Sequence, residues 1–193
     1  EAAKYWIQYL GAPSSVYDAS YPDEQYSDHW SRPNFAEWEG GDAYLMWHTN
    51  AYDGTARGTV TFIHASSPSP GSAALQTALH SALIGDIHAV FDPEWYDRGR
   101  RTGDYIELGG VDTMPAVLLE LAFHDNEQDA AYLNDPDFRY HVSRAMARGF
   151  GAYFDPEAPA PPLPPTNLTV QNLGGGSVRI AFHPPGDLAR PDT

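Results

Sequence analysis

The sequence contains no cysteine, no apolar run of membrane length and few basic residues, and each absence excludes a class of protein. Without cysteine, the chain has neither a disulfide framework nor a cysteine-ligated zinc site. No stretch reaches the roughly 18 consecutive apolar residues of a membrane-spanning helix. The 11 basic residues are outnumbered by 26 acidic ones, for a formal net charge of −15. Because such a surface repels phosphate backbones, we do not expect a nucleic-acid partner.

The 193 residues are enough for one domain and part of a second. Helical and strand patterns are mixed along residues 1–155, which predicts an α/β domain with a mostly parallel sheet flanked by helices. A proline-rich linker follows at residues 156–165. Two alternating segments joined by Gly174–Gly176 then predict a β-hairpin. Two strands cannot bury a core, so we expect residues 166–193 to begin a larger β domain.

The stretch Ala116–Phe123 is apolar at every position except Glu120, which is typical of a strand buried inside a sheet. Alternation places Glu120 on the same face as the small Ala122. A carboxylate in such a strand is costly unless a cation or hydrogen bonds compensate it. Glu120 is therefore either a paired core residue or a catalytic acid and base.

The other helices, strands and loops are predicted from the spacing of apolar residues and from the positions of glycine and proline. The patterns predict helices at residues 1–10, 34–38, 72–91 (capped by Ser72), 127–133 and 136–153. They predict strands at residues 15–18, 42–48 (also buried), 57–65 and 106–108. They predict exposed loops at residues 18–32 and 92–101.

His48 is the second candidate for chemistry, because it ends the predicted strand 42–48 and is followed by a polar loop. In open α/β sheets, ligands bind beyond the carboxyl ends of the strands. A neutral imidazole is a good zinc ligand, and a nearby carboxylate can take a proton from zinc-bound water. The alternative is an ordinary hydrogen-bonded histidine. No HExxH, GxSxG, P-loop or GxGxxG motif is present.

Three further residues are candidates for substrate binding: Asn50, Arg57 and His124. Asn50 lies in the loop that follows His48. Arg57 could bind a substrate carboxylate, although a structural ion pair is the alternative. His124 follows Glu120 by four residues and could face the same cleft or only stabilise the turn.

Two segments together resemble the amidase-3 group of zinc-dependent N-acetylmuramoyl-L-alanine amidases. His48–Ala51 and Ala56–Phe62 are similar to its SIHANA…ARGTETF segment. Met114–Phe123, with Asn126, is similar to its MPAVLVELGF..N segment. Residues 167–185 are similar to the opening strands of a fibronectin type III domain.

The resemblance implies that His48 is one of three zinc ligands and that Glu120 is the catalytic residue. The other two ligands, a His in a GHGG-like turn and a Glu ahead of the first helix, have no counterpart, since Glu1 is too close to Gly11. We therefore expect them upstream of residue 1, and we expect this chain alone to bind zinc poorly and to be inactive.

The implied reaction is hydrolysis of the amide that joins N-acetylmuramic acid to L-alanine in peptidoglycan, at the cell envelope or outside a bacterium. One alternative is a non-catalytic cell-wall binding module that keeps the amidase fold. Another is a zinc peptidase that acts on cell-wall peptides. The sequence leaves the oligomeric state open.

Overall fold

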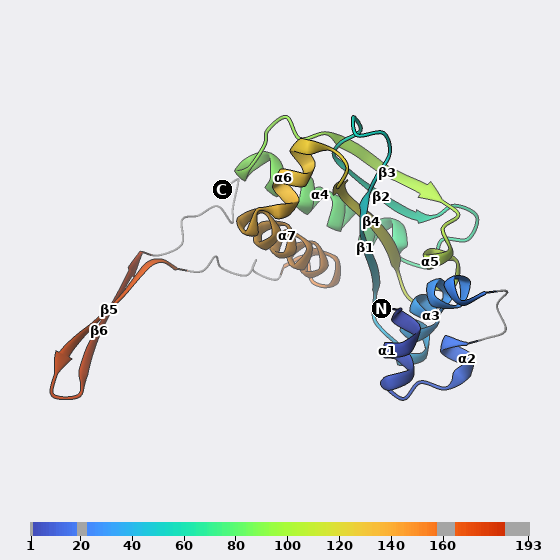
Figure 1. Ribbon diagram of the computed structural model, residues 1–193, viewed down its shortest axis with the longest axis horizontal. Helices are drawn as coiled ribbons and strands as arrows, with labels where there is room; N and C mark the ends of the chain where they lie inside the picture. The colour runs from blue at the N-terminus through green and yellow to red at the C-terminus, as the bar shows by residue number, and fades with distance from the viewer. Residues whose placement is uncertain (1, 19–22, 158–164, 184–193) are drawn as a thin grey trace. The chain divides into compact units, whose positions relative to one another are not determined.

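A computed structural model describes residues 2–18, 23–157 and 165–183, and the chain divides into two compact units, of which the first ends at Phe154 and the second begins at Asp155. The larger unit is built on a sheet with strand order β1-β4-β2-β3 (Figure 1). β1 pairs with β4 and β2 pairs with β3 in parallel, whereas β2 and β4 are antiparallel. The predicted α/β class with a mostly parallel sheet is thereby confirmed. The strands are β1 (Tyr44–Asn50), β2 (Thr59–His64), β3 (Asp97–Gly103) and β4 (Ala116–Phe123).

β4 is the central strand that its composition predicts. Every residue of β4 is buried except Glu120, which is half-buried. β1 lies at one end of the described sheet and its residues are half-buried or exposed. The expectation of a second buried strand at residues 42–48 was therefore wrong in burial, although the strand itself is present two residues further on.

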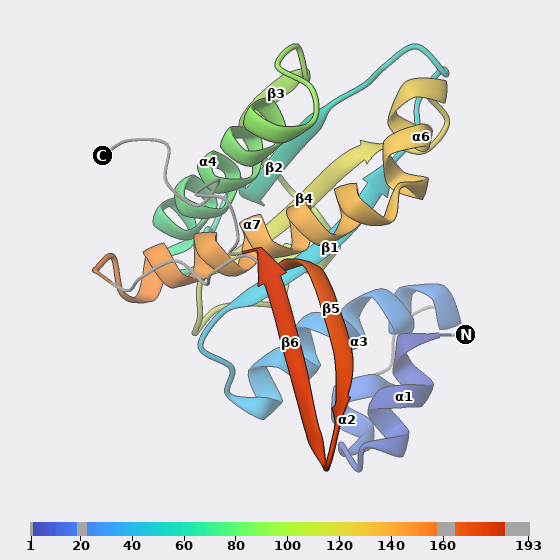
Figure 2. The same ribbon diagram turned by 90° about the vertical axis from the view of Figure 1, so that its left-hand side faces the viewer.

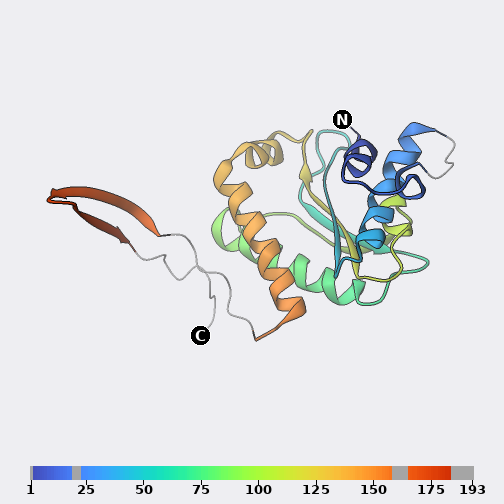
Figure 3. The ribbon, with the colours of Figure 1, turned by 90° about the horizontal axis from the view of Figure 1, so that it is seen from below.

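Helices cover both faces of the sheet and define two cores (Figures 2 and 3). The larger core joins α4 and α7 to odd-numbered positions of β4, such as Val117 and Leu119. The smaller core joins Ala116 and Leu118 of β4 to the region of α3 and α5. The helices are α1 (Ala3–Tyr9), α2 (Ser14–Tyr17), α3 (Glu24–Glu39), α4 (Ser72–Val90), α5 (Ile106–Gly109), α6 (Glu127–Asn134) and α7 (Pro136–Phe154).

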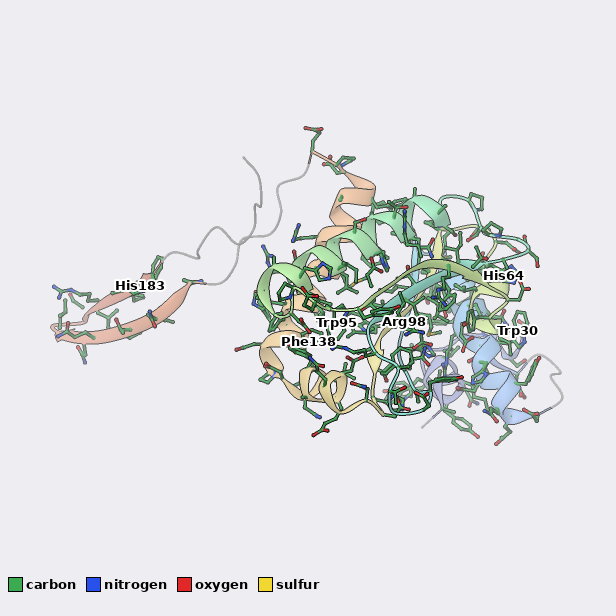
Figure 4. All side chains as sticks on the ribbon, turned by 90° about the horizontal axis from the view of Figure 1, so that it is seen from above. Trp30, His64, Trp95, Arg98, Phe138 and His183 are labelled. Atoms are coloured by element: carbon green, nitrogen blue, oxygen red, sulfur yellow. The ribbon has the colours of Figure 1, made fainter. Side chains whose placement is uncertain are left out.

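The side chains of Trp95 and Phe138 lie together in the larger core, with ring centroids 5.6 Å apart (Figure 4). Elsewhere in the larger unit, Trp30 and His64 both approach Gly109, where α3 and α5 meet (Figure 4). None of the helices in the described part of the chain is long and apolar enough to cross a membrane.

The helix α3 replaces most of the loop expected at residues 18–32; residues 19–22 lie outside the described residues. The side chain of Asp23 accepts a hydrogen bond from the N–H of Tyr26, and Gly40 ends the helix in the left-handed conformation. The expected short helix at residues 34–38 is only the last part of α3. The segment is mostly polar and contains Pro33, so its pattern did not predict a helix. The capping residues Asp23 and Gly40 are what mark the two ends of α3.

Three other local expectations were also wrong. Residues 14–17 and 106–109 form single helical turns rather than strands, and each buries one apolar side chain, Val16 and Leu108 respectively. Residues 97–103 form β3 instead of a loop, because pairing with β2 and hydrogen bonding of Arg101 O to Gln76 override their polar composition.

Ser72 does not cap α4, since the N-cap residue is Gly71 and no side chain caps the helix. The Ser72 hydroxyl instead accepts a hydrogen bond of 2.9 Å from the N–H of Ala116. Ser72 therefore ties the start of α4 to the start of the central strand.

The smaller unit contains the predicted hairpin of β5 (Thr166–Gly174) and β6 (Ser177–His183). Its turn needs glycine, because Gly174, Gly175 and Gly176 all have positive φ. Five apolar side chains of the hairpin each expose more than half of their surface: Leu168, Val170, Val178, Ile180 and Phe182. Linker residues 158–164 and the end of the expected β domain, residues 184–193, lie outside the described residues.

The crossing of α4 and α7 gives a first testable prediction. A Cβ added at Gly149 would lie 2.8 Å from the Leu79 Cα, so the backbones of the two helices would have to separate. We expect Gly149→Ala to lower the free energy of unfolding by about 1–3 kcal/mol in urea denaturation. The control is Gly151→Ala in the same helix, which meets nothing within 4 Å and should add about 0.5–1 kcal/mol. Equal effects of the two substitutions would contradict this account of the crossing.

Candidate active site

The parallel register of β1 and β4 places His48 directly beside Glu120. Neighbouring residues of a parallel pair project to the same face of the sheet, so the two side chains are adjacent. This face is the one that the α3 and α5 region covers, because Ala116 and Leu118, the earlier even-numbered residues of β4, pack in the smaller core. The structure therefore brings together the two residues that the sequence singled out for chemistry.

The carboxyl group of Glu120 is partly withdrawn from water. Its Oε2 atom is buried and has no hydrogen-bond partner among the described residues. Burial raises the pKa of Glu120 to about 7, and the carboxylate of Glu107 contributes to the shift by repulsion. A carboxyl group with this pKa can both accept and donate a proton near neutral pH. The alternative of a salt-bridged core glutamate does not describe Glu120, for which no cationic partner is found in the described part of the chain.

His48 is half-buried, and burial lowers its pKa. The carboxylate of Glu107 opposes this shift, while electrostatic repulsion from the side chains of Arg32 and His29 adds to it. The imidazole is thereby favoured in its neutral form, which is the form that binds metals.

Sequence reasoning missed the contribution of α3 and α5 to this site. Arg32 and His29 come from α3, and Glu107 comes from α5; all three are close enough to His48 to change its pKa. Burial, together with the charge of Glu120, also raises the pKa of Tyr105, which lies just before α5. The sequence does contain the two capping residues of α3, Asp23 and Gly40, from which the helix could have been predicted. They do not indicate where the helix packs.

The zinc site that the resemblance implies needs three protein ligands. His48 fits one of those positions by residue type and by its place beside Glu120. No group of three His, Cys, Asp or Glu side chains within residues 2–18, 23–157 and 165–183 could hold a metal ion. A complete zinc site therefore requires ligands from outside these residues.

Strict alternation had led us to expect Ala122 on the same face as Glu120. The structure places it on the opposite face. The register shifts between His48–Glu120 and Asn50–Phe123, which leaves one extra residue in β4. Ala122 consequently packs in the larger core with Leu121.

The structure places Arg57 in a network of polar and ionic contacts. Its guanidinium group lies 3.0 Å from Asp92 Oδ2 and 3.6 Å from Asp129 Oδ1, and it donates a hydrogen bond of 2.6 Å to Gln128. The group also lies over the ring of Trp95. These contacts agree with the alternative that Arg57 forms structural ion pairs. Its role in substrate binding stays a prediction.

Asn50 and His124 lie at the carboxyl ends of β1 and β4, next to each other. The N–H of His124 donates to the carbonyl of Asn50, and the side chain of Asn50 accepts from the N–H of Ala51. The ring of His124 pairs with the Thr49 hydroxyl at 3.1 Å. Both residues follow the His48–Glu120 pair along their strands, and their binding roles remain predictions.

Comparison with known proteins identifies a single catalytic family. The family Amidase 3, described as N-acetylmuramoyl-L-alanine amidase, matches residues 8–152. The amidase CwlM of Bacillus licheniformis is 33% identical over 124 residues, which are 64% of this chain and 45% of CwlM. A cell wall amidase of Bacillus anthracis is 29% identical over 124 residues, which are 64% of this chain and 23% of that protein. The chain thus spans less than half the length of either relative.

Solved structures agree with this comparison. The catalytic domain of the amidase CwlV from Paenibacillus polymyxa superposes with a TM-score of 0.57 at 28% identity, covering 66% of this chain and 65% of that one. An N-acetylmuramoyl-L-alanine amidase from Clostridium difficile 630 gives a TM-score of 0.60 at 21% identity and covers 72% of both chains. The second likeness concerns the fold alone.

The environment of Glu120 predicts how stability depends on pH. An unfolded chain releases this proton near pH 4.5, whereas the folded chain keeps it up to about pH 7. The folded state therefore binds more protons in this window, and Glu120 lowers the stability of the wild type as pH rises through it. We expect the stability advantage of Glu120→Gln over the wild type to grow by about 1–2 kcal/mol from pH 5 to pH 8, because the carboxyl group is partly exposed and solvent screens part of the effect.

Urea denaturation of both proteins at the two pH values measures this gain. The control is Glu94→Gln, which alters an exposed carboxylate and should give the same difference at both pH values. A Glu120→Gln variant whose advantage does not grow with pH would show that Glu120 is not desolvated in the folded chain.

Proposed function

Because the chain belongs to the Amidase 3 family of N-acetylmuramoyl-L-alanine amidases, we propose that it forms part of a zinc-dependent peptidoglycan hydrolase. The substrate bond is the amide between the lactyl group of N-acetylmuramic acid and L-alanine of the stem peptide. The observation that carries the proposal is the desolvated carboxyl of Glu120 beside His48 on adjacent parallel strands. By similarity to cell wall amidases, the place of action is the bacterial cell envelope or the space outside it.

In this proposal, Glu120 moves the proton. It accepts a proton from the water molecule whose oxygen attacks the amide carbonyl, and it passes a proton to the nitrogen of L-alanine as the C–N bond breaks. A pKa of about 7 suits both halves of this transfer. Burial of the carboxyl group, with the nearby charge of Glu107, keeps this pKa raised.

His48 is proposed as one ligand of the family's zinc ion, which would polarise the amide carbonyl. The proposal requires further ligands that residues 2–18, 23–157 and 165–183 do not supply. We propose residues 1–155 as the C-terminal portion of the catalytic domain, and residues 166–193 as the start of a fibronectin type III domain after the linker. Asn50, Arg57 and His124 remain proposed substrate contacts.

Zinc titration of the 193-residue chain tests whether this chain lacks the remaining zinc ligands. A single imidazole cannot hold zinc tightly, so we expect calorimetry to give no stoichiometric binding in the micromolar range, both for the wild type and for His48→Ala. Tight one-to-one binding that His48→Ala abolishes would show instead that the chain completes a site by itself.

Digestion of purified peptidoglycan by a longer protein that contains this chain and the missing ligands tests the reaction. We expect new amino termini on L-alanine and no cleavage between stem residues. Glu120→Gln should lower kcat about 10²- to 10⁴-fold while zinc content is retained, since only the proton transfer is lost.

Cleavage between stem residues would indicate a peptidase. Binding without cleavage would indicate a cell-wall binding module. A matched control is Glu94→Gln, which removes an exposed carboxylate and should turn over like the wild type.

A further inference from the structure

The segment that follows His48 is tied to the turn that follows Glu120 by three side chains. Asp125 Oδ2 accepts hydrogen bonds of 2.8 and 3.1 Å from the N–H groups of Tyr52 and Gly54. The Asn126 side chain donates to the carbonyl of Gly54 at 3.1 Å. Asp129 Oδ2 accepts from the N–H groups of Gly58 and Phe123, at 2.8 and 2.9 Å. We call these three side chains, Asp125, Asn126 and Asp129, the loop clasp.

The loop clasp lies just beyond the point where the regular pairing of β1 and β4 is interrupted. The regular register of β1 and β4 runs from Tyr44–Ala116 to His48–Glu120 and is interrupted immediately afterwards by the extra residue in β4. The strands pair again at Asn50–Phe123, so the backbone pairing that follows His48–Glu120 is irregular, whereas the pairing that precedes it is regular. Beyond the interruption, the two strand ends are joined by the bond from His124 N–H to Asn50 and by side chains.

The members of the loop clasp differ in what else they do. Asp129 is fully buried and also faces Arg57, and Asn126 caps α6 by accepting from two backbone N–H groups, so both have structural duties. Asp125 is exposed, and its side chain accepts the two bonds from the loop after β1. Asp125 is thus the member whose removal separates the loop from the turn with the least effect on the core.

We propose that Asp125 is a positioning residue, which holds His48 at its place beside Glu120 through the loop clasp. That this pair is the reacting pair rests on the proposed function. Interrupted strands beside a site re-aim side chains, and reacting groups need a placement within about 0.5 Å. A side chain that fixes the strand ends beyond the interruption therefore sets the geometry of the pair without touching it.

The test uses the 193-residue chain and needs no turnover. Nuclear magnetic resonance of the labelled protein records how far Glu120→Gln moves the imidazole signals of His48. We expect a clear movement in the otherwise wild-type chain and a movement reduced about twofold or more in the Asp125→Ala background. Asp125→Asn keeps an oxygen acceptor for both N–H groups and should restore the wild-type movement.

The matched control is Asp53→Ala. The Asp53 carboxylate also accepts backbone N–H groups, those of Thr55 and Ala56, but its bonds stay within the loop and do not cross to the turn. This control loses the same charge in the same loop, and we expect the His48 response to stay at its wild-type size.

Amide exchange of Tyr52 and Gly54 reports whether Asp125→Ala has opened the clasp. Opened amides with an unchanged His48 response would overturn the proposal, as would an equal loss of response in Asp53→Ala. If Asp125→Ala does not fold, Asp125→Ser decides, because its shorter side chain lacks the carboxylate oxygen that accepts from the N–H groups of Tyr52 and Gly54. That variant should reduce the response, and an unchanged response would refute the proposal. Failure of the longer protein to cleave peptidoglycan would refute the proposed function and leave this result standing.

Discussion

The adjacency of His48 and Glu120 in the ladder between β1 and β4 is the constraint on which the rest of the site depends. It brings together an imidazole and a carboxyl group that are 72 residues apart in the sequence, through the pairing of two parallel strands. The cost is a buried carboxyl oxygen with no partner in the described residues. A fold retains such a group only where the surroundings are otherwise stable, and the well-packed core on the opposite face of β4 provides that stability.

The two faces of the sheet therefore have different tasks. The face covered by α4 and α7 is apolar and tightly packed, with large side chains such as Leu79, Leu83 and Phe138 fully buried. The opposite face has only a small apolar core and carries polar groups from several elements toward Glu120. The division explains why one strand can be both the centre of the hydrophobic core and the carrier of an ionisable group.

The sequence predicted the parts of the molecule whose patterns are local. The apolar run around Glu120, the helical stripe of α7 and the three glycines of the hairpin turn each indicate their own structure, and each was found. The predictions from the sequence were wrong or incomplete where the structure depends on contacts between segments that are distant in the chain. The segment Asp97–Gly103 is almost entirely polar and becomes a strand because β2 lies beside it. Glu107 and Arg32 reach the site because of how α5 and α3 pack, which no spacing in the chain reveals. The irregularity that turns Ala122 away from Glu120 is likewise a property of two strands together.

The central position of β4 also constrains the order in which the molecule can assemble. β1 and β2 each pair with β4, which is made after both of them, and they do not pair with each other. During synthesis, residues 44–64 have therefore left the ribosome long before their shared neighbour at residues 116–123 exists. Until β4 is made, β1 lacks its neighbour in the described sheet and β2 can pair only with β3, so the nascent chain is exposed to aggregation during that interval. Binding by a chaperone that recognises extended apolar segments would be concentrated in this interval, and slower elongation across residues 65–115 would prolong it.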